Sequence, residues 1–251
     1  MITRSRSPAT VDSVLRMRTR WRVPAGSGEP VVDEWTEVGV DAVLDQLGVR
    51  GREQPMVLAV DGRSGAGKST LATRLRAAAP AAALVATDDV AWHYSRFDWA
   101  DELITAVIEP VRRGRPVHYR PPGWVLKNRP GAVIIAPGTR LLIIEGVGSS
   151  QRALGEMIDA AIWVQSDAEV ARERGIARDV ASGVNGDHQA ATVFWDEWAA
   201  EEEPFLAADA PWSRADVIMA GVPAVLGSKL CWQASAGTVP TTPPPAPPRT
   251  L

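Results

Sequence analysis

The sequence predicts an α/β fold in which a parallel β-sheet is covered by helices on both of its faces. Short, continuously apolar runs alternate with segments of helical periodicity along most of the chain. Strands that are apolar on both sides are typical of parallel sheets that lie between two helical layers. A glycine-rich segment also lies directly between one apolar run and the helical pattern that follows it. With 251 residues, 45% of them hydrophobic, the chain is long enough to bury one substantial core.

The expected elements follow one another from residue 41 to residue 220. A short amphipathic helix is expected at 41–47, because Val43, Leu44 and Leu47 recur at helical spacing. Apolar runs predict strands at 56–60, 83–86, 140–144, 160–165 and 216–220. Helical patterns predict helices at 68–78, 100–113 and 167–181. This alternation is typical of consecutive βα units.

The two ends of the chain differ from this central part. Residues 1 to about 30 are polar and punctuated by proline and glycine, so we expect them to be loosely ordered. Together with the helix at 41–47 they form an expected N-terminal extension, residues 1–53. The main domain is expected at 54–232. Residues 233–251 are dense in proline and predict a disordered tail.

Composition excludes several classes of function. A formal net charge of -3 argues against general nucleic-acid binding, which usually needs a basic domain. Cys231 is the only cysteine, so an intramolecular disulfide is excluded and a reducing, cytoplasmic location is expected. No run approaches the roughly 20 apolar residues of a membrane helix, so no membrane partner is expected. A small-molecule partner is expected instead, and the sequence predicts no particular oligomeric state.

The glycine-rich segment, VDGRSGAGKST at 60–70, carries the pattern of a phosphate-binding loop, or P-loop. Glycines allow the backbone amides to close around phosphate oxygens, and the helix that begins near Lys68 adds the positive end of its dipole. Lys68 would reach the β and γ phosphates of ATP, and the Ser69 hydroxyl would coordinate Mg²⁺. A purely structural glycine turn is the alternative, but the strand before and the helix after favour the P-loop. The expected nucleotide-binding residues are Gly62, Arg63, Ser64, Gly65, Ala66, Gly67, Lys68, Ser69 and Thr70.

Carboxylates follow two of the other predicted strands. Glu145 ends the apolar run LLIIE and is expected to bind Mg²⁺, directly or through water. Asp88 and Asp89 follow the run at 83–86, where a carboxylate could accept the proton of an attacking hydroxyl. Neighbouring residues on an extended chain point to opposite sides, so we expect only one of these two acids to face the acceptor. Capping of the following turn is the alternative role.

These motifs together resemble the uridine kinase and phosphoribulokinase group of P-loop kinases, particularly the uridine-cytidine kinases. The resemblance spans residues 56–221 and rests on GRSGAGKST, on TDD, on Phe97-Asp98, on LLIIEGV and on VQSDAEVARERGIARD at 164–179. It implies a P-loop NTPase fold, kinase-like with a helical lid segment. It also implies that Asp88 is the catalytic carboxylate, that Asp98 contacts a sugar hydroxyl, and that Arg174 and Arg178 clamp phosphates.

Two further features bear on the site. Arg174 and Arg178 are four residues apart, so they share a helix face and could converge on the transferring phosphoryl group. A solvated face paired with Glu173 and Asp179 is the alternative.

The segment expected to line the acceptor pocket agrees with the family only in part. Arg129 matches an arginine of the family's pattern, and Trp124 could stack on a planar acceptor, as could Trp92 and Trp99. Pro122 and Lys127 stand where nucleoside kinases of this group carry a tyrosine and a histidine, so the acceptor need not be a pyrimidine nucleoside.

The sequence therefore predicts an ATP-dependent, Mg²⁺-requiring phosphotransferase that acts on a hydroxyl of a small molecule, for which a nucleoside-like compound is one candidate. A GTPase is disfavoured because the chain has no Asn-Lys-x-Asp guanine reader. One alternative is a nucleoside monophosphate kinase, in which Arg96, Arg120 or Arg129 would bind the acceptor's phosphate. The other is an ATP-binding regulatory protein without efficient turnover.

Overall fold

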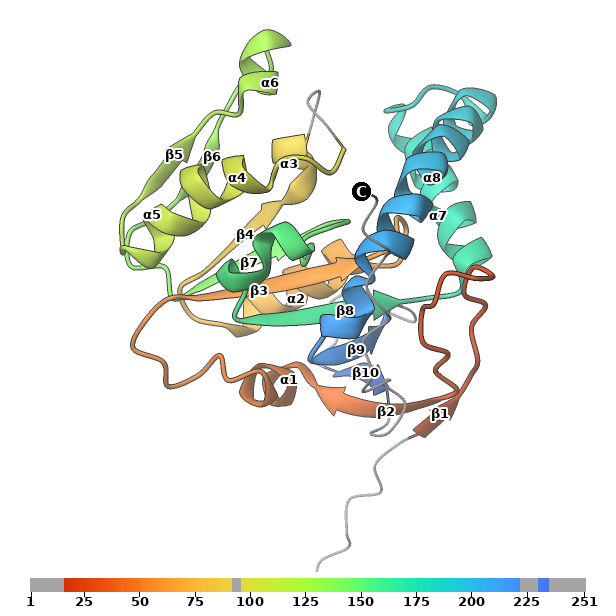
Figure 1. Ribbon diagram of the computed structural model, residues 1–251, viewed down its shortest axis with the longest axis horizontal. Coiled ribbons are helices and arrows are strands. Elements are labelled where there is room, and N and C mark those ends of the chain that lie inside the picture. The colour runs from red at the N-terminus through yellow and green to blue at the C-terminus, as the bar shows by residue number, and fades with distance from the viewer. Residues whose placement is uncertain (1–15, 92–95, 222–229, 235–251) are drawn as a thin grey trace, which may run out of the picture.

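The computed structural model describes residues 16–91, 96–221 and 230–234, and an eight-stranded β-sheet forms its centre (Figure 1). The strand order is β1-β2-β10-β9-β8-β3-β7-β4. Strands β9, β8, β3, β7 and β4 pair in parallel, whereas β10, β2 and β1 extend the sheet through antiparallel pairs. The strands span β1 (Arg16–Arg18), β2 (Glu34–Gly39), β3 (Met56–Gly62), β4 (Ala82–Ala86), β7 (Leu141–Glu145), β8 (Ala160–Gln165), β9 (Val217–Ala220) and β10 (Leu230–Ala234).

Helices cover both faces of this sheet. One face packs against α1 (Val40–Gln46) and α2 (Lys68–Ala78), and the other against the continuous helical run α4 (Ala100–Leu103), η1 (Ile104–Ile108) and α5 (Glu109–Arg112). Two longer helices, α7 (Ala168–Ser182) and α8 (His188–Asp209), contact each other and lie beside the carboxyl end of the sheet (Figure 1). The remaining elements are α3 (Thr87–Ala91), β5 (Val117–Tyr119), α6 (Pro122–Leu126), β6 (Val133–Ile135), η2 (Arg152–Met157) and η3 (Pro211–Arg214).

The predicted apolar strands in the middle of the sheet are buried on both sides, whereas the edge strand β4 is mostly half-buried. In β3, Met56, Leu58 and Val60 pack towards α1 and α2, whereas Val57 joins the cluster on the opposite face. The same alternation divides β7, since Leu141 and Ile143 face one helical layer and Leu142 and Ile144 face the other. The predicted α/β fold class is therefore confirmed, with a mostly parallel sheet between two helical layers and three strands added through antiparallel pairs.

The predicted helix at 100–113 is present but not uniform, because its middle, η1, is a π-helical turn. Pro110 follows this turn and has no backbone N–H to continue the α-helical hydrogen-bond pattern, which accounts for the local change. Among the described residues no helix is long and apolar enough to cross a membrane.

The sheet extends across both domain boundaries expected from the sequence. Strands β1 and β2 lie within the segment expected to be an N-terminal extension, and β10 crosses residue 232. The stretch before residue 30 is also more ordered than expected where it is described, because Glu29 is buried, as are Val32 and Trp35 shortly after it. Residues 1–15 and 235–251, which include most of the expected disordered tail, lie outside the described part of the chain.

Candidate active site

The P-loop follows the central strand of the parallel sheet. From β3, the next strands along the chain, β4 and β7, lie on one side, and β8 and β9 lie on the other. Ligands of open α/β sheets bind at the carboxyl end of the strands where this order reverses. The loop is also tightly enclosed: a Cβ on Gly65 would lie 2.2 Å from the carbonyl oxygen of Ala171, and Gly67 has φ 103°. Both positions therefore require glycine.

Lys68 begins α2 and points back into the curve of this loop. Its Nζ donates a hydrogen bond to the carbonyl oxygen of Arg63 at 2.8 Å, and the residue is only 8% exposed. A helix N-terminus with free amides and a nearby ammonium is a binding site for phosphate groups. Lys68 thus faces the interior of the loop, whereas the side chain of Arg63 turns away to an ion pair with Glu29 at 2.8 Å.

Ser69, the residue after Lys68, lies beside Glu145 at the end of β7. The Ser69 hydroxyl is hydrogen-bonded to the Glu145 carboxylate. Burial raises the pKa of Glu145, and the charge of Lys68 and the bond from Ser69 oppose that rise. Within the described residues no group of three or more His, Cys, Asp or Glu side chains could hold a metal ion. A hydroxyl and one carboxylate fit the way Mg²⁺ is usually held with nucleotides, with phosphates and water as the other ligands.

Asp88 and Asp89 lie at the start of α3, so they are helical rather than extended and the expected strand alternation does not apply. Their environments still differ. Asp88 is exposed, whereas Asp89 is half-buried and forms an ion pair with Arg129 at 3.2 Å. Burial raises the pKa of Asp89, and Arg129 acts against this shift. Both carboxylates are close enough to raise the pKa of Glu145 through their charge. Asp88 is therefore the more solvent-accessible of the two carboxylates.

Trp124 is a packing residue in this structure, which differs from the stacking platform expected from the sequence. Only 6% of the residue is exposed, and its indole Nε1 donates to the carbonyl oxygen of Asp89 at 2.8 Å. The guanidinium of Arg129 lies 3.7 Å from the ring centroid and covers one face. Trp99 is likewise buried, and Trp92 lies outside the described residues. Asp98 is exposed in the segment that leads into α4.

The two lid arginines do not converge as predicted. Arg174 is half-buried, and its Nη2 approaches the carbonyl oxygen of Gly65 in the P-loop at 3.4 Å. Burial lowers the pKa of this guanidinium. Arg178 instead binds the carboxylate of Asp179 at 2.8 and 3.0 Å, and its side chain is 67% exposed. Asp179 also accepts a hydrogen bond from Trp195, so this carboxylate holds Arg178 one turn away from the loop.

Asp61, directly before the P-loop, is a functional candidate that the sequence motifs do not identify. It is fully buried and accepts four hydrogen bonds, from the amides of Gly62, Gly148 and Ser150 and from the Ser150 hydroxyl. Burial raises its pKa, and the bonds from Ser150 and Gly62 and the charge of Lys68 oppose the rise. The carboxylate ties the start of the P-loop to the segment after Glu145. The sequence signal that could have identified Asp61 is an acidic residue at the end of an otherwise apolar strand.

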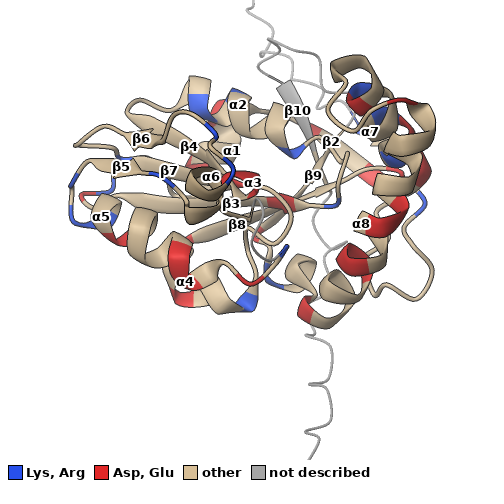
Figure 2. Cartoon of the chain, turned by 90° about the horizontal axis from the view of Figure 1, so that it is seen from above, with Lys and Arg blue, Asp and Glu red and all other residues tan. Residues whose placement is uncertain are grey.

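Acidic residues gather at α3 and along α8, and basic residues lie on α7, around the carboxyl end of the sheet (Figure 2). Beyond Asp61, two buried glutamates contact the P-loop from outside it: Glu29 and Glu202. No sequence motif marks either residue, since both lie far from the loop along the chain.

No protein-family model and no curated protein matches the chain. Solved structures do match. One is described as a "putative fructose transport system kinase" from Silicibacter sp. TM1040, with 20% identity, 62% of this chain and 87% of that chain covered, and a TM-score of 0.49. Another is described as a "possible uridine kinase" from Bacillus stearothermophilus, with 16% identity, 71% and 96% covered, and a TM-score of 0.46. Likenesses at this level carry no statement about activity. The strand order and the loop after the central strand give the chain a P-loop NTPase α/β fold.

Proposed function

We propose that the chain is an ATP-dependent kinase that transfers the γ phosphate to a hydroxyl group of a small molecule. One observation carries the proposal: Lys68, the Ser69–Glu145 pair and Asp88 lie together at the carboxyl ends of the neighbouring strands β3, β7 and β4. These are the groups needed to hold phosphates, a divalent cation and an acceptor hydroxyl. The resemblance of the motifs to uridine kinase-like enzymes supports the same reading.

Each residue has a defined task in this proposal. The P-loop amides and Lys68 bind and orient the phosphates, while Ser69 and Glu145 would hold Mg²⁺, which supplies charge neutralisation when it is bound. Asp88 accepts the proton of the acceptor hydroxyl as that oxygen attacks phosphorus. Arg174, whose Nη2 approaches the carbonyl oxygen of Gly65, would stabilise the charge that develops on the transferring group.

A nucleoside monophosphate acceptor is disfavoured, because the arginines that would bind its phosphate are engaged. Arg129 is paired with Asp89, and Arg120 donates to the carbonyl oxygen of Arg129. Arg96 lies against α8, 3.2 Å from Glu201. We therefore favour an acceptor without a phosphate group.

ADP release in the presence of Mg·ATP and one acceptor at a time tests the proposal. The panel would contain nucleosides, nucleoside monophosphates, sugars and vitamin-like alcohols. We expect turnover with one class that lacks phosphate, and its loss in Asp88→Asn. Binding of Mg·ATP without turnover on any acceptor would instead identify a regulatory nucleotide-binding protein.

A further inference from the structure

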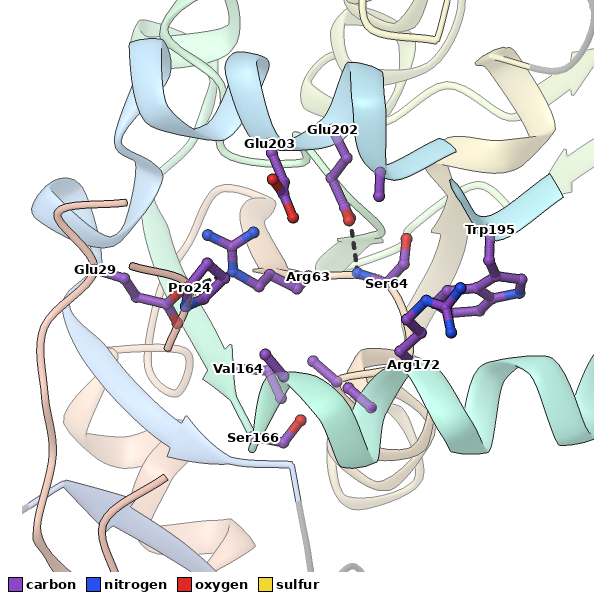
Figure 3. A pocket seen from close by; sticks show the side chains of 14 residues that line it. Pro24, Glu29, Arg63, Ser64, Val164, Ser166, Arg172, Trp195, Glu202 and Glu203 are labelled. Atoms are coloured by element: carbon purple, nitrogen blue, oxygen red, sulfur yellow. Dashed lines mark hydrogen bonds and ion pairs between the residues drawn. The ribbon is translucent and has the colours of Figure 1, made fainter. Parts of the chain in front are cut away.

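We propose that two buried carboxylates from outside the P-loop, Glu29 and Glu202, are positioning residues that hold the first half of the loop in its nucleotide-accepting shape (Figure 3). The inference rests on the proposed function, because it assumes that this loop binds nucleotide. It adds that a segment near the N-terminus and helix α8 both belong to the nucleotide site.

Glu29 anchors the side chain of Arg63, the second residue of the P-loop. Its carboxylate is buried and accepts hydrogen bonds from Arg63 Nε at 2.8 Å, from Trp163 Nε1 at 3.0 Å and from Gln165 Nε2 at 3.0 Å. Trp163 and Gln165 belong to β8, so Glu29 joins the loop to a rigid strand of the sheet. Buried pairs of this kind hold their geometry because each lost bond leaves a polar group without a partner.

Glu202 anchors the backbone of the next loop residue. Its Oε1 accepts a hydrogen bond from the amide of Ser64 at 2.8 Å, and the residue is 6% exposed. A buried carboxylate bonded to an amide is a charge-assisted contact, which is stronger than a neutral one. It fixes the orientation of the peptide that joins Arg63 to Ser64. Glu203, the next residue of α8, is exposed, so these two neighbouring glutamates differ in burial.

Both carboxylates line one cavity of about 80 Å³ between the N-terminal segment, the P-loop and α8, and Pro24, Trp195 and the exposed Glu203 also lie in its wall (Figure 3). This volume is far below the roughly 300 Å³ or more of a typical ligand pocket. Glu29 and Glu202 therefore act through the loop and not on the nucleotide itself. Because Glu29 neutralises Arg63, the positive side chain that the loop and the start of α2 offer to the phosphates is Lys68.

The first test compares two adjacent residues of α8. Binding of Mg·ADP is measured by titration calorimetry for the full chain and for Glu202→Ala, Glu202→Gln and Glu203→Ala. We expect Glu202→Ala to weaken binding about tenfold or more, because fewer molecules hold the competent loop shape. Glu202→Gln keeps an acceptor oxygen and should recover most of that loss, and Glu203→Ala should bind as the wild type does. Binding of Glu202→Ala within about twofold of the wild type would overturn the proposal.

The second test removes the other anchor without leaving a buried charge. Glu29→Gln alone could unfold the protein, because an unpaired buried guanidinium is costly. The double variant Glu29→Met, Arg63→Met removes both charges, and replacing a buried pair in this way is often neutral for stability. Trp163 and Gln165 also lose their bonds to Glu29 in this variant, so we expect a lower melting temperature, and Mg·ADP binding of the folded protein weakened about tenfold. Wild-type affinity in a folded double variant would refute the role of Glu29.

Lys68→Ala separates failure of this inference from failure of the proposed function. If Lys68→Ala abolishes Mg·ADP binding while the Glu29 and Glu202 variants bind normally, only the positioning role is wrong. If Lys68→Ala binds as the wild type does, the nucleotide site itself is wrongly assigned.

Discussion

Asp61→Asn tests whether the buried carboxylate before the P-loop holds two parts of the site together. The substitution keeps the size of the side chain but replaces one acceptor oxygen with an NH₂ donor. In the wild type, Oδ1 accepts from Gly62 and Gly148, and Oδ2 accepts from the amide and the hydroxyl of Ser150. If the oxygen of the new amide stays on the Gly62 side, the NH₂ group of the same side chain faces the backbone N–H of Ser150. Two hydrogen-bond donors then oppose each other.

The magnitude follows from these four contacts. An unsatisfied buried amide costs about 1–3 kcal/mol, and this is the dominant loss. The Ser150 hydroxyl can rotate to accept from the new NH₂ group, and the two bonds that remain lose their charge assistance, about 1 kcal/mol each. Removal of a buried charge offsets part of this loss, since burial raises the pKa of Asp61. We expect the free energy of unfolding to fall by about 2–4 kcal/mol.

Urea unfolding of the wild type, Asp61→Asn and Ser150→Ala measures this effect. Ser150→Ala removes the hydroxyl bond alone and should cost about 1 kcal/mol. Asp61→Asn should cost clearly more and should also weaken Mg·ADP binding, because the Ser150 amide no longer bonds to residue 61 and the segment after Glu145 is held less firmly to the loop. An Asp61→Asn protein as stable as Ser150→Ala would refute this account of the buried carboxylate.

Three further predictions concern single side chains. Asp88→Asn should lower acceptor-dependent ADP release by about 10² to 10⁴; Asp89→Asn should lower it far less, and the reverse order would move the base by one residue. Trp124→Ala should lower the free energy of unfolding by about 3–5 kcal/mol; a loss confined to acceptor affinity would contradict its packing role. Asp167 caps α7 and pairs with Arg22, which lowers its pKa from 3.8 to about 2. Its stabilisation should therefore be present above about pH 4 and be lost as the pH falls towards 2, and unfolding curves of Asp167→Ala should lack this pH-dependent part.

The parts of the site that could be predicted are those encoded locally. The P-loop, Glu145 and the two acids of α3 each follow an apolar strand, and the parallel sheet brings the ends of those strands together. A short motif on each strand was therefore sufficient to place Lys68, Ser69, Glu145 and Asp88 near one another.

The parts that could not be predicted depend on pairings between distant segments. The pair of Glu29 with Arg63 and the bond of Glu202 to Ser64 join residues 34 and 138 positions apart. Helix α8 was not predicted, because Pro204 lies inside it and its buried residues include a glutamate, which obscures the apolar period. The sequence left two roles open for Arg174 and Arg178, namely phosphate binding and pairing with Glu173 and Asp179. The structure separates the two residues, because Arg178 binds Asp179 whereas Arg174 approaches the P-loop.

Equilibrium binding of Mg·ATP to the wild type and to Lys68→Ala tests the central claim most directly. Lys68 donates to the loop through a single bond, so its removal should leave the fold intact, with a melting temperature close to that of the wild type. We expect saturable binding at one site in the wild type and at least about tenfold weaker binding in the variant, because a buried ammonium beside the phosphates is lost. Equal affinity in the two proteins, or no binding of Mg·ATP to the wild type, would contradict the assignment of a nucleotide site to this loop.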